Sequence, residues 1–148
     1  MRVVVANDHA GFPIKKAVVE AIHLAGHELI DLGINSKKQV DFPDYVEKAG
    51  RLIQNGQAER GILICGSGVG VCIAANKMKG VYAGLCHDTY SAHQGVEHDH
   101  MNVLCLGGKI IGTELAKEIV IAFLAAHKLN DERYVTRVNK ILVIEQKE

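Results

Sequence analysis

The sequence carries no excess charge of either sign. Lys plus Arg and Asp plus Glu both number 17 among 148 residues, so the formal net charge is zero at pH 7. A balanced chain has no broad positive field that would attract nucleic acid or an anionic membrane. A local site must therefore select the partner, which we expect to be a small molecule rather than nucleic acid or a membrane.

Long hydrophobic runs are also absent. No apolar stretch approaches the roughly 20 residues of a membrane-spanning helix. The first apolar run, Val3–Ala6, soon meets Asp8 and is too short for the core of a signal peptide. We therefore expect a soluble, cytoplasmic protein.

The four cysteines include no C-x-x-C pair, and the eight histidines show no spacing typical of a zinc site. The cysteine count would allow two disulfides, but most of the cysteines lie in or beside apolar segments. Reduced, buried thiols in a reducing compartment are the simpler interpretation. A structural metal is not expected.

No repeat, low-complexity tract or linker divides the chain. Hydrophobic residues make up 48% and charged residues 23%, which is the balance of an ordinary globular protein. A chain of 148 residues fits one hydrophobic core. We expect a single domain over residues 1–148.

Short apolar runs without polar alternation are typical of strands covered on both faces of a parallel sheet. They are Val3–Ala6, Leu29–Leu32, Ile62–Cys65, Ala83–Cys86 and Val103–Leu106. Helical spacing is found between Pro13 and Gly26, over Asp44–Asn55, from near Gly68, Thr89 and Gly112, and over Asp131–Lys140. Ile34–Asp41 has no periodicity and is expected to be an exposed loop. The alternation predicts a three-layer α/β/α, Rossmann-like domain with a five-stranded parallel sheet, whose ligands bind beyond the carboxyl ends of the strands.

A carboxylate and an imidazole follow the first predicted strand, in Asn7-Asp8-His9-Ala10-Gly11. Asp8 could merely cap the next helix, and from Asp8 alone this interpretation and a functional one are about equally supported. His9 favours function, because an imidazole at a helix N-terminus suits an anionic ligand such as a phosphate or a hydroxyl-rich sugar.

Three glycines follow the third predicted strand, in Cys65-Gly66-Ser67-Gly68-Val69-Gly70, and allow backbone amides to converge on a negative group. The segment lacks the Lys-Ser/Thr of a P-loop and the spacing of a dinucleotide fingerprint, so nucleotide binding is the weaker interpretation. Cys65 stands directly before these amides, where a thiolate is favoured and could act as a base. The alternative, a cysteine that only packs, fits Cys72, Cys86 and Cys105 better.

Three histidines, His93, His98 and His100, lie within eight positions. A proton-transfer role for one of them is more plausible than a metal site, because zinc ligands usually come as separated pairs. Spacing does not identify which one, and the roles of His87, His93 and His100 stay open.

Arg133 and Arg137 are four positions apart in the last predicted helix and therefore share a face. Paired guanidinium groups suit a phosphate, although a solvated face is the commoner use of such charges. Lys109, after Gly107-Gly108, is equally ambiguous.

Together, these motifs resemble the ribose-5-phosphate isomerase B and galactose-6-phosphate isomerase family. The matching stretches are Asn7–Gly11, Ile64–Gly70 with Ala74–Lys77, Glu97–His98 with Asn102–Leu104, and Arg133–Arg137, which cover nearly the whole chain in the family's order. The resemblance implies an aldose-ketose isomerase without metal or organic cofactor, with D-ribose 5-phosphate and D-ribulose 5-phosphate as the expected pair and a cis-enediolate between them. It also implies a homodimer or homotetramer whose sites are shared between subunits.

The resemblance further implies a role for each matching residue. Cys65 would be the base, Ser67 and His98 would open the sugar ring, and Asp8 would contact sugar hydroxyls. The amides of Gly66, Gly68, Val69 and Gly70 would stabilise the oxyanion, His9, Arg133 and Arg137 would bind phosphate, and His98 and Lys109 would serve a neighbouring subunit's pocket.

Two positions depart from the family pattern. Asp99 stands where Asn is common, and Lys109 where Arg is common. An extra carboxylate would alter hydroxyl recognition or tune His98, and Lys would bind phosphate as a point charge. Two alternatives therefore stay open: a six-carbon substrate such as allose or galactose 6-phosphate, and a non-catalytic sugar-phosphate sensor, against which Cys65, Ser67 and His98 argue because a sensor needs no base.

Overall fold

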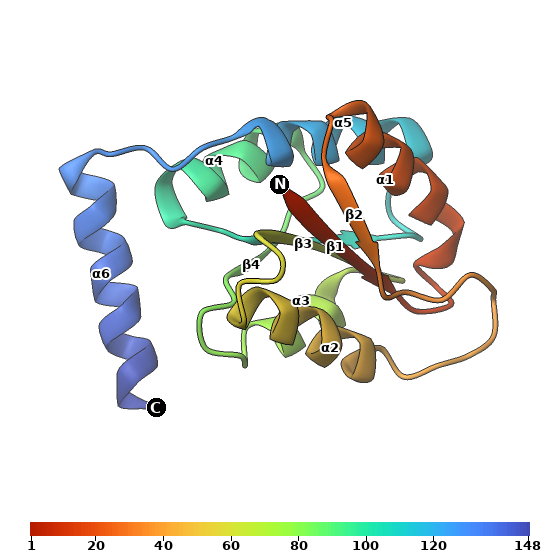
Figure 1. Ribbon diagram of the computed structural model, residues 1–148, viewed down its shortest axis with the longest axis horizontal. Coiled ribbons are helices and arrows are strands. Elements are labelled where there is room, and N and C mark those ends of the chain that lie inside the picture. Colours follow the sequence, from red (N-terminus) through yellow and green to blue (C-terminus); the bar gives the residue numbers. More distant parts are fainter.

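Five parallel strands form the central sheet of the computed structural model, which describes residues 1–148 (Figure 1). They are β1 (Arg2–Asn7), β2 (Glu28–Asp31), β3 (Arg60–Cys65), β4 (Ala83–Leu85) and β5 (Val103–Gly107), in the spatial order β2-β1-β3-β5-β4. The three central strands are buried almost throughout, which explains their lack of polar alternation. The predicted parallel sheet is confirmed.

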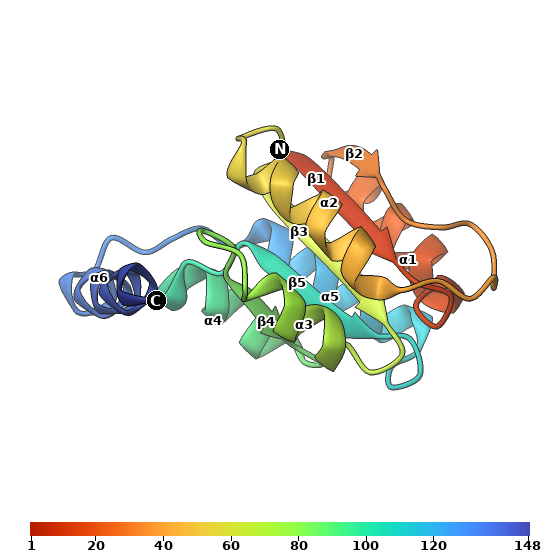
Figure 2. The same cartoon turned by 90° about the horizontal axis from the view of Figure 1, so that it is seen from below.

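Helices cover both faces of this sheet (Figures 1 and 2). One layer consists of α1 (Phe12–Leu24), α4 (Thr89–Asp99) and α5 (Thr113–Ala125), and the other of α2 (Phe42–Gln54) and α3 (Val69–Ala75). Each layer seals its own apolar cluster against the sheet, of 21 and 12 buried residues respectively. The α/β/α prediction is therefore confirmed, with α2 beginning at Phe42, two residues before the predicted start.

The last helix, α6 (Glu132–Lys147), is longer than predicted. We expected it to end at Lys140, but no glycine or proline stops it and apolar residues continue at helical spacing. Val138 is its only buried residue, whereas Ile141, Val143 and Ile144 are 43%, 48% and 61% exposed. In both views α6 stands at one end of the body rather than over the sheet (Figures 1 and 2).

The segment Ile34–Asp41 is irregular and mostly exposed, as predicted. All four cysteines are free thiols, three of them buried and Cys72 half-buried. None of the helices is both long enough and apolar enough to cross a membrane.

Candidate active site

Three loops meet beyond the carboxyl ends of β1, β3 and β5, which are neighbours in the sheet. Glycines let these loops pack backbone against backbone. A Cβ at Gly11 would lie 2.3 Å from the Ile64 carbonyl oxygen, and one at Gly108 would lie 2.5 Å from the Ala10 carbonyl oxygen. The sequence motifs after β1 and β3 therefore share one site, and the Gly107–Lys109 turn completes it.

Asp8 holds the turn between β1 and α1. Its Oδ1 accepts hydrogen bonds from the amides of Ala10 and Gly11, both at 2.9 Å, and the residue is only 5% exposed. The N-cap residue of α1 is Gly11 and no side chain caps it, so the capping interpretation is wrong and this oxygen stabilises the preceding turn instead. Oδ2 accepts no bond within the chain, which leaves one carboxylate oxygen for a hydroxyl-bearing ligand.

The ring of His9 is oriented by the Ile34–Asp41 loop. The Val40 amide donates to His9 Nδ1 at 3.3 Å, so in the neutral ring the proton is on Nε2. The loop is anchored by buried Lys15, whose ammonium contacts Asp31 Oδ1 at 2.8 Å and Asn35 Oδ1 at 2.7 Å. Neither Val40 nor Lys15 was singled out from the sequence, because a loop's packing partners have no local signature.

Cys65 ends β3, is 5% exposed and lies against an amide. The Gly68 amide donates to Cys65 Sγ at 3.2 Å, and Gly68 has a φ of +78°, a backbone conformation that favours glycine. Ser67 is exposed, and its Oγ accepts from the Val69 amide at 3.2 Å. The Cys65 sulfur therefore accepts a backbone amide at the carboxyl edge of the sheet, which is where ligands bind in folds of this kind.

Lys109 lies over its own chain's cysteine loop. Its amide donates to the Gly66 carbonyl at 3.0 Å, and a Cβ at Gly66 would lie 3.6 Å from Lys109 Cδ. The expectation that the Lys109 ammonium serves a neighbouring subunit stays a prediction, and what the structure shows is that the Lys109 side chain passes over the loop of its own chain. The reason is the tight turn after β5, which folds back when the Gly108 amide donates to the Cys65 carbonyl at 2.8 Å.

His98 and Asp99 lie at the opposite edge of the sheet. Helix α4 returns the chain from the carboxyl end of β4 to the amino end of β5 and ends at Asp99, just before Val103 begins β5. A strand of five residues separates the two edges by roughly 15 Å. One chain therefore does not bring His98 to Cys65.

The ring of His98 is held by two neighbours that the sequence analysis missed. The Gln94 amide nitrogen lies 2.9 Å from His98 Nδ1, and because an amide nitrogen only donates, the neutral ring carries its proton on Nε2. Tyr134 of α6 stacks on the ring at 3.8 Å between centroids. Gln94 also contacts Asp99 Oδ2 at 3.3 Å, so the unusual Asp99 is linked to His98 through this amide. The four-residue spacing from Gln94 to His98 was the available signal.

The other two histidines of the stretch have local partners. His93 Nδ1 lies 3.1 Å from Glu97 Oε2, one turn along α4. His100 ends α4 in a left-handed conformation, and burial lowers its pKa. Neither histidine lies beside the predicted site residues at the carboxyl edge of the sheet.

Arg133 and Arg137 differ in what they contact. Arg133 Nη2 and Nε bond both carboxylate oxygens of Asp131, at 2.9 and 3.1 Å, and this guanidinium holds the pKa of Asp131 down at about 2. Arg137 has no hydrogen-bonding or ionic partner in the chain. Arg137 is therefore the more available of the two for an anion. Both belong to α6, which contacts the amino-edge residue Tyr82 through Glu145.

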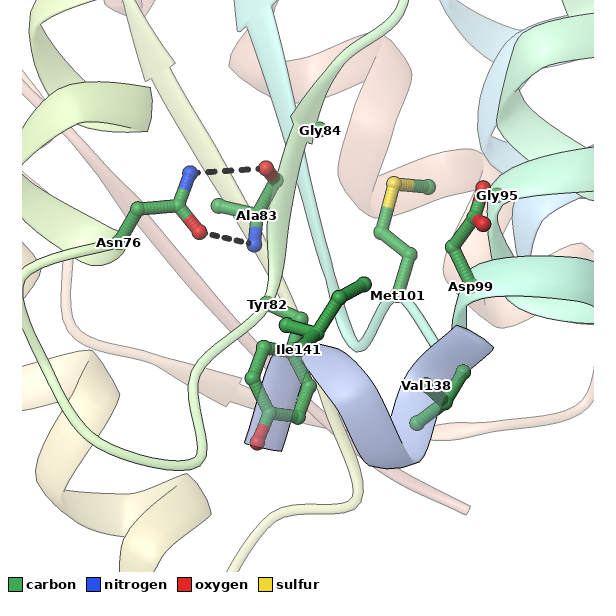
Figure 3. A pocket seen from close by; sticks show the side chains of 9 residues that line it. All are labelled: Asn76, Tyr82, Ala83, Gly84, Gly95, Asp99, Met101, Val138 and Ile141. Carbon is green, nitrogen blue, oxygen red and sulfur yellow. Dashed lines mark hydrogen bonds between the residues drawn. The ribbon is translucent and has the colours of Figure 1, made fainter. Parts of the chain in front are cut away.

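An apolar hollow of about 280 Å³ lies between β4, α4 and α6 (Figure 3). Tyr82, Met101, Val138 and Ile141 form much of its wall, and Asn76 pairs with both backbone groups of Ala83 at 2.9 Å. Asp99 is the only predicted site residue in it. The hollow therefore lacks the groups that chemistry would need, and no group of three or more His, Cys, Asp or Glu side chains is placed to hold a metal ion.

Comparison with known proteins identifies relatives along almost the entire chain. A sequence profile described as Ribose/Galactose Isomerase matches residues 3–141. Ribose-5-phosphate isomerase B of Escherichia coli is 41% identical over 140 residues, which cover 95% of this chain and 93% of the relative.

Two solved structures share the fold closely. Type B ribose 5-phosphate isomerase of Trypanosoma brucei superposes with a TM-score of 0.93 at 39% identity, covering 97% of each chain. Ribose-5-phosphate isomerase B of Mycoplasma genitalium, solved with bound ribulose-5-phosphate, gives a TM-score of 0.89 at 36% identity and covers 99% of this chain and 97% of the other. From its matching profile, its relatives and its fold, the chain belongs to the ribose/galactose isomerase family.

Proposed function

We propose that this chain interconverts D-ribose 5-phosphate and D-ribulose 5-phosphate as an aldose-ketose isomerase. The observation that carries the proposal is Cys65, a nearly buried thiol that accepts the Gly68 amide at 3.2 Å. Asp8, His9 and Lys109 surround the same carboxyl edge and supply groups for hydroxyls and phosphate. The activity named for relatives of 36 to 41% identity agrees with this chemistry.

The proposed reaction is a proton transfer between two neighbouring carbons. The Cys65 thiolate takes the proton from C2 of the open-chain aldose, and the electron pair of that C–H bond forms the enediolate as the C1 carbonyl oxygen becomes negative. The thiol then returns the proton to C1, the C2 hydroxyl gives up its proton as C2 becomes the ketone, and the negative C1 oxygen takes up a proton to become a hydroxyl. The backbone amides of Gly66, Gly68, Val69 and Gly70 are the donors proposed to stabilise the developing charge.

Ring opening and recognition are assigned to the remaining residues. His98, whose Nε2 carries a proton in the neutral ring, and Ser67 are proposed to shuttle the protons of ring opening. Asp8 Oδ2 accepts from a sugar hydroxyl. His9, Arg137 and Arg133 bind the phosphate, with Lys109 as a further cation.

A second copy of the chain is needed to complete this site. Cys65 and His9 lie at the carboxyl edge of the sheet, whereas His98, Arg133 and Arg137 lie at the amino edge. Apolar side chains are exposed near both halves: Val69 and Ile73 at 46% and 59% beside the cysteine loop, and Ile144 at 61% on α6. We infer a homodimer, or a homotetramer built from such dimers, in which one subunit's amino-edge residues face the other's Cys65.

The free cysteines indicate the cell compartment. All four cysteines are free, which suits a reducing environment. We place the enzyme in the cytoplasm.

The test of this function is a coupled assay over five- and six-carbon aldose and ketose phosphates, with and without a chelator. We expect ribose 5-phosphate to give the highest kcat/KM, and activity to survive exhaustive chelation because the proposed oxyanion donors are backbone amides. A six-carbon phosphate as the best substrate would favour the alternative that the family's description includes, a galactose-type isomerase. Binding without turnover of any sugar phosphate would indicate a sensor.

Replacing Arg137 is expected to weaken substrate use without touching the reacting carbons. Arg137→Ala should lower kcat/KM by about ten- to a hundred-fold, because a charged hydrogen bond to phosphate is lost. Arg137→Lys should recover only part of this, since it keeps the charge but not the planar fork.

Two comparisons sharpen this measurement. Arg133→Ala should cost less than Arg137→Ala, because Asp131 already engages Arg133 at 2.9 Å. The slow turnover of unphosphorylated ribose should change little in Arg137→Ala. Unchanged kinetics of Arg137→Ala on the phosphorylated substrate would mean that this face of α6 is only solvated.

A further inference from the structure

His87 lies just beyond the point where the backbone pairing of the edge strand β4 with β5 ends. Beyond Leu85 the backbone pairing ends with a long bond of 3.4 Å from the Cys86 amide to the Cys105 carbonyl. The amide of Gly107, two residues further along buried β5, donates instead to His87 Nε2 at 2.9 Å. A buried N–H needs an acceptor, so the imidazole replaces the strand that is missing here.

This bond requires a neutral imidazole. Because the Gly107 N–H can only donate, His87 Nε2 must be unprotonated and the ring proton lies on Nδ1. Burial lowers the pKa of His87 and outweighs the opposing effect of the neighbouring Asp88 carboxylate. Leu106 and Gly107, on the strand that faces the ring, bring no ionisable side chain.

Gly107 in turn supports the loop that carries the proposed base. It is the register partner of Cys65 in the β3–β5 pairing. A Cβ at Gly107 would lie 2.7 Å from the carbonyl carbon and oxygen of Ser67, so the two backbones are in direct contact. The two amides that follow Gly107 donate to the carbonyls of Cys65 and Gly66, at 2.8 and 3.0 Å.

We propose that His87 is a positioning residue for the isomerisation: its neutral ring fixes the Gly107 amide and, through it, the Cys65–Gly68 loop. The proposal rests on the proposed function, since it assigns a support for the same base. His87 needs no contact with the substrate for this role. Its effect should appear in the placement of Cys65 relative to the reacting carbons, where small displacements reduce rate strongly.

The proposal fixes the sign of a pH effect. The acceptor is present above the pKa of His87 and is lost as the pH falls through that lowered pKa. Below it, both ring nitrogens carry protons, and Gly107 N–H faces another donor. We expect the protection of the Gly107 amide, measured against the intrinsic exchange rate at the same pH, to fall at such pH values together with kcat.

The test compares His87→Leu, which removes the acceptor, with His87→Gln, whose amide oxygen can accept in a similar place but does not titrate. His87→Leu should lower kcat by about ten- to a hundred-fold, and His87→Gln by no more than about three-fold. His23→Gln is the matched control, because His23 is exposed on α1 and its side chain has no hydrogen-bonding partner; its kcat should equal that of the unsubstituted chain.

Gly107 amide exchange, followed by NMR, reads the bond without any activity measurement. Protection should fall in His87→Leu, and the acid-side loss of protection seen in the unsubstituted chain should vanish in His87→Gln. The proposal would be overturned by an unchanged kcat in a folded His87→Leu protein. It would also be overturned if neither substitution nor pH changed the protection of the Gly107 amide. If His87→Leu fails to fold, His87→Gln and the pH dependence decide it. Absence of isomerase activity in the unsubstituted chain would instead overturn the proposed function, and the positioning role with it, even if the bond is confirmed by exchange.

Discussion

Cys65→Ala is expected to lower isomerisation by about 10²- to 10⁴-fold in both directions while the protein keeps its fold and binds the sugar phosphate. The substitution removes the proposed base but none of the groups that hold phosphate or hydroxyls. Binding of ribulose 5-phosphate, measured by calorimetry, should therefore persist. The rate of solvent-deuterium uptake at the substrate's C2 should fall with the overall rate, since the same sulfur performs both steps.

Cys72 offers a matched thiol control. Contact with Cys105 lowers the pKa of Cys72 to about 7, so acidity alone would mark Cys72 as the reactive cysteine. Its sulfur, however, lies 3.6 Å from the Ala83 carbonyl, whereas Cys65 accepts the Gly68 amide within the loop cluster. Cys72→Ala should retain most of the activity. Deuterium uptake that persists in Cys65→Ala and disappears in Cys72→Ala would move the base to the second thiol.

Much of the fold could be predicted because burial on both faces leaves a direct mark on the sequence. Val3–Ala6 and Val103–Leu106 are apolar at every position because both helical layers cover them. Polar and glycine motifs directly after β1 and β3 then had to meet, since parallel neighbouring strands end at the same edge. The position of Cys65 beside Asp8 and His9 follows from this rule.

The partners of individual side chains could not be predicted in the same way. The pairing of Arg133 with Asp131 and the position of Lys109 over Gly66 depend on how turns fold back, which spacing does not show. His87 was left open for the same reason: its acceptor role exists only because β4 is short enough to leave the Gly107 amide unpaired. Local patterns identified the chemical groups, but tertiary contacts decide which of them are already occupied.

Cys65 and Arg137 lie at opposite edges of the sheet, and this separation predicts that variants of the two residues restore activity when they are combined. If each site combines the carboxyl edge of one subunit with the amino edge of another, Cys65→Ala and Arg137→Ala damage different halves of the same site. A mixed dimer of the two variants then has one site with both defects and one site with neither. Two poorly active proteins should therefore produce an active one when their subunits are exchanged.

The size of the recovery is set by how subunits combine. Random exchange makes about half of the dimers mixed, and half of the sites in a mixed dimer are intact, so the mixture should reach about a quarter of the unsubstituted activity. Differently tagged variants, refolded together or coexpressed, allow mixed dimers to be isolated and assayed, and these should approach half. Mixing Cys65→Ala with the double variant Cys65→Ala/Arg137→Ala is the control, because no intact site can form. If every subunit built its own site, the activity of the mixture would be the average of the two parent variants and would stay below the residual rate of Arg137→Ala. In that case α6 would have to approach the carboxyl edge of its own chain. The stacking of Tyr134 on His98, with 3.8 Å between the ring centroids, holds α6 on the opposite side.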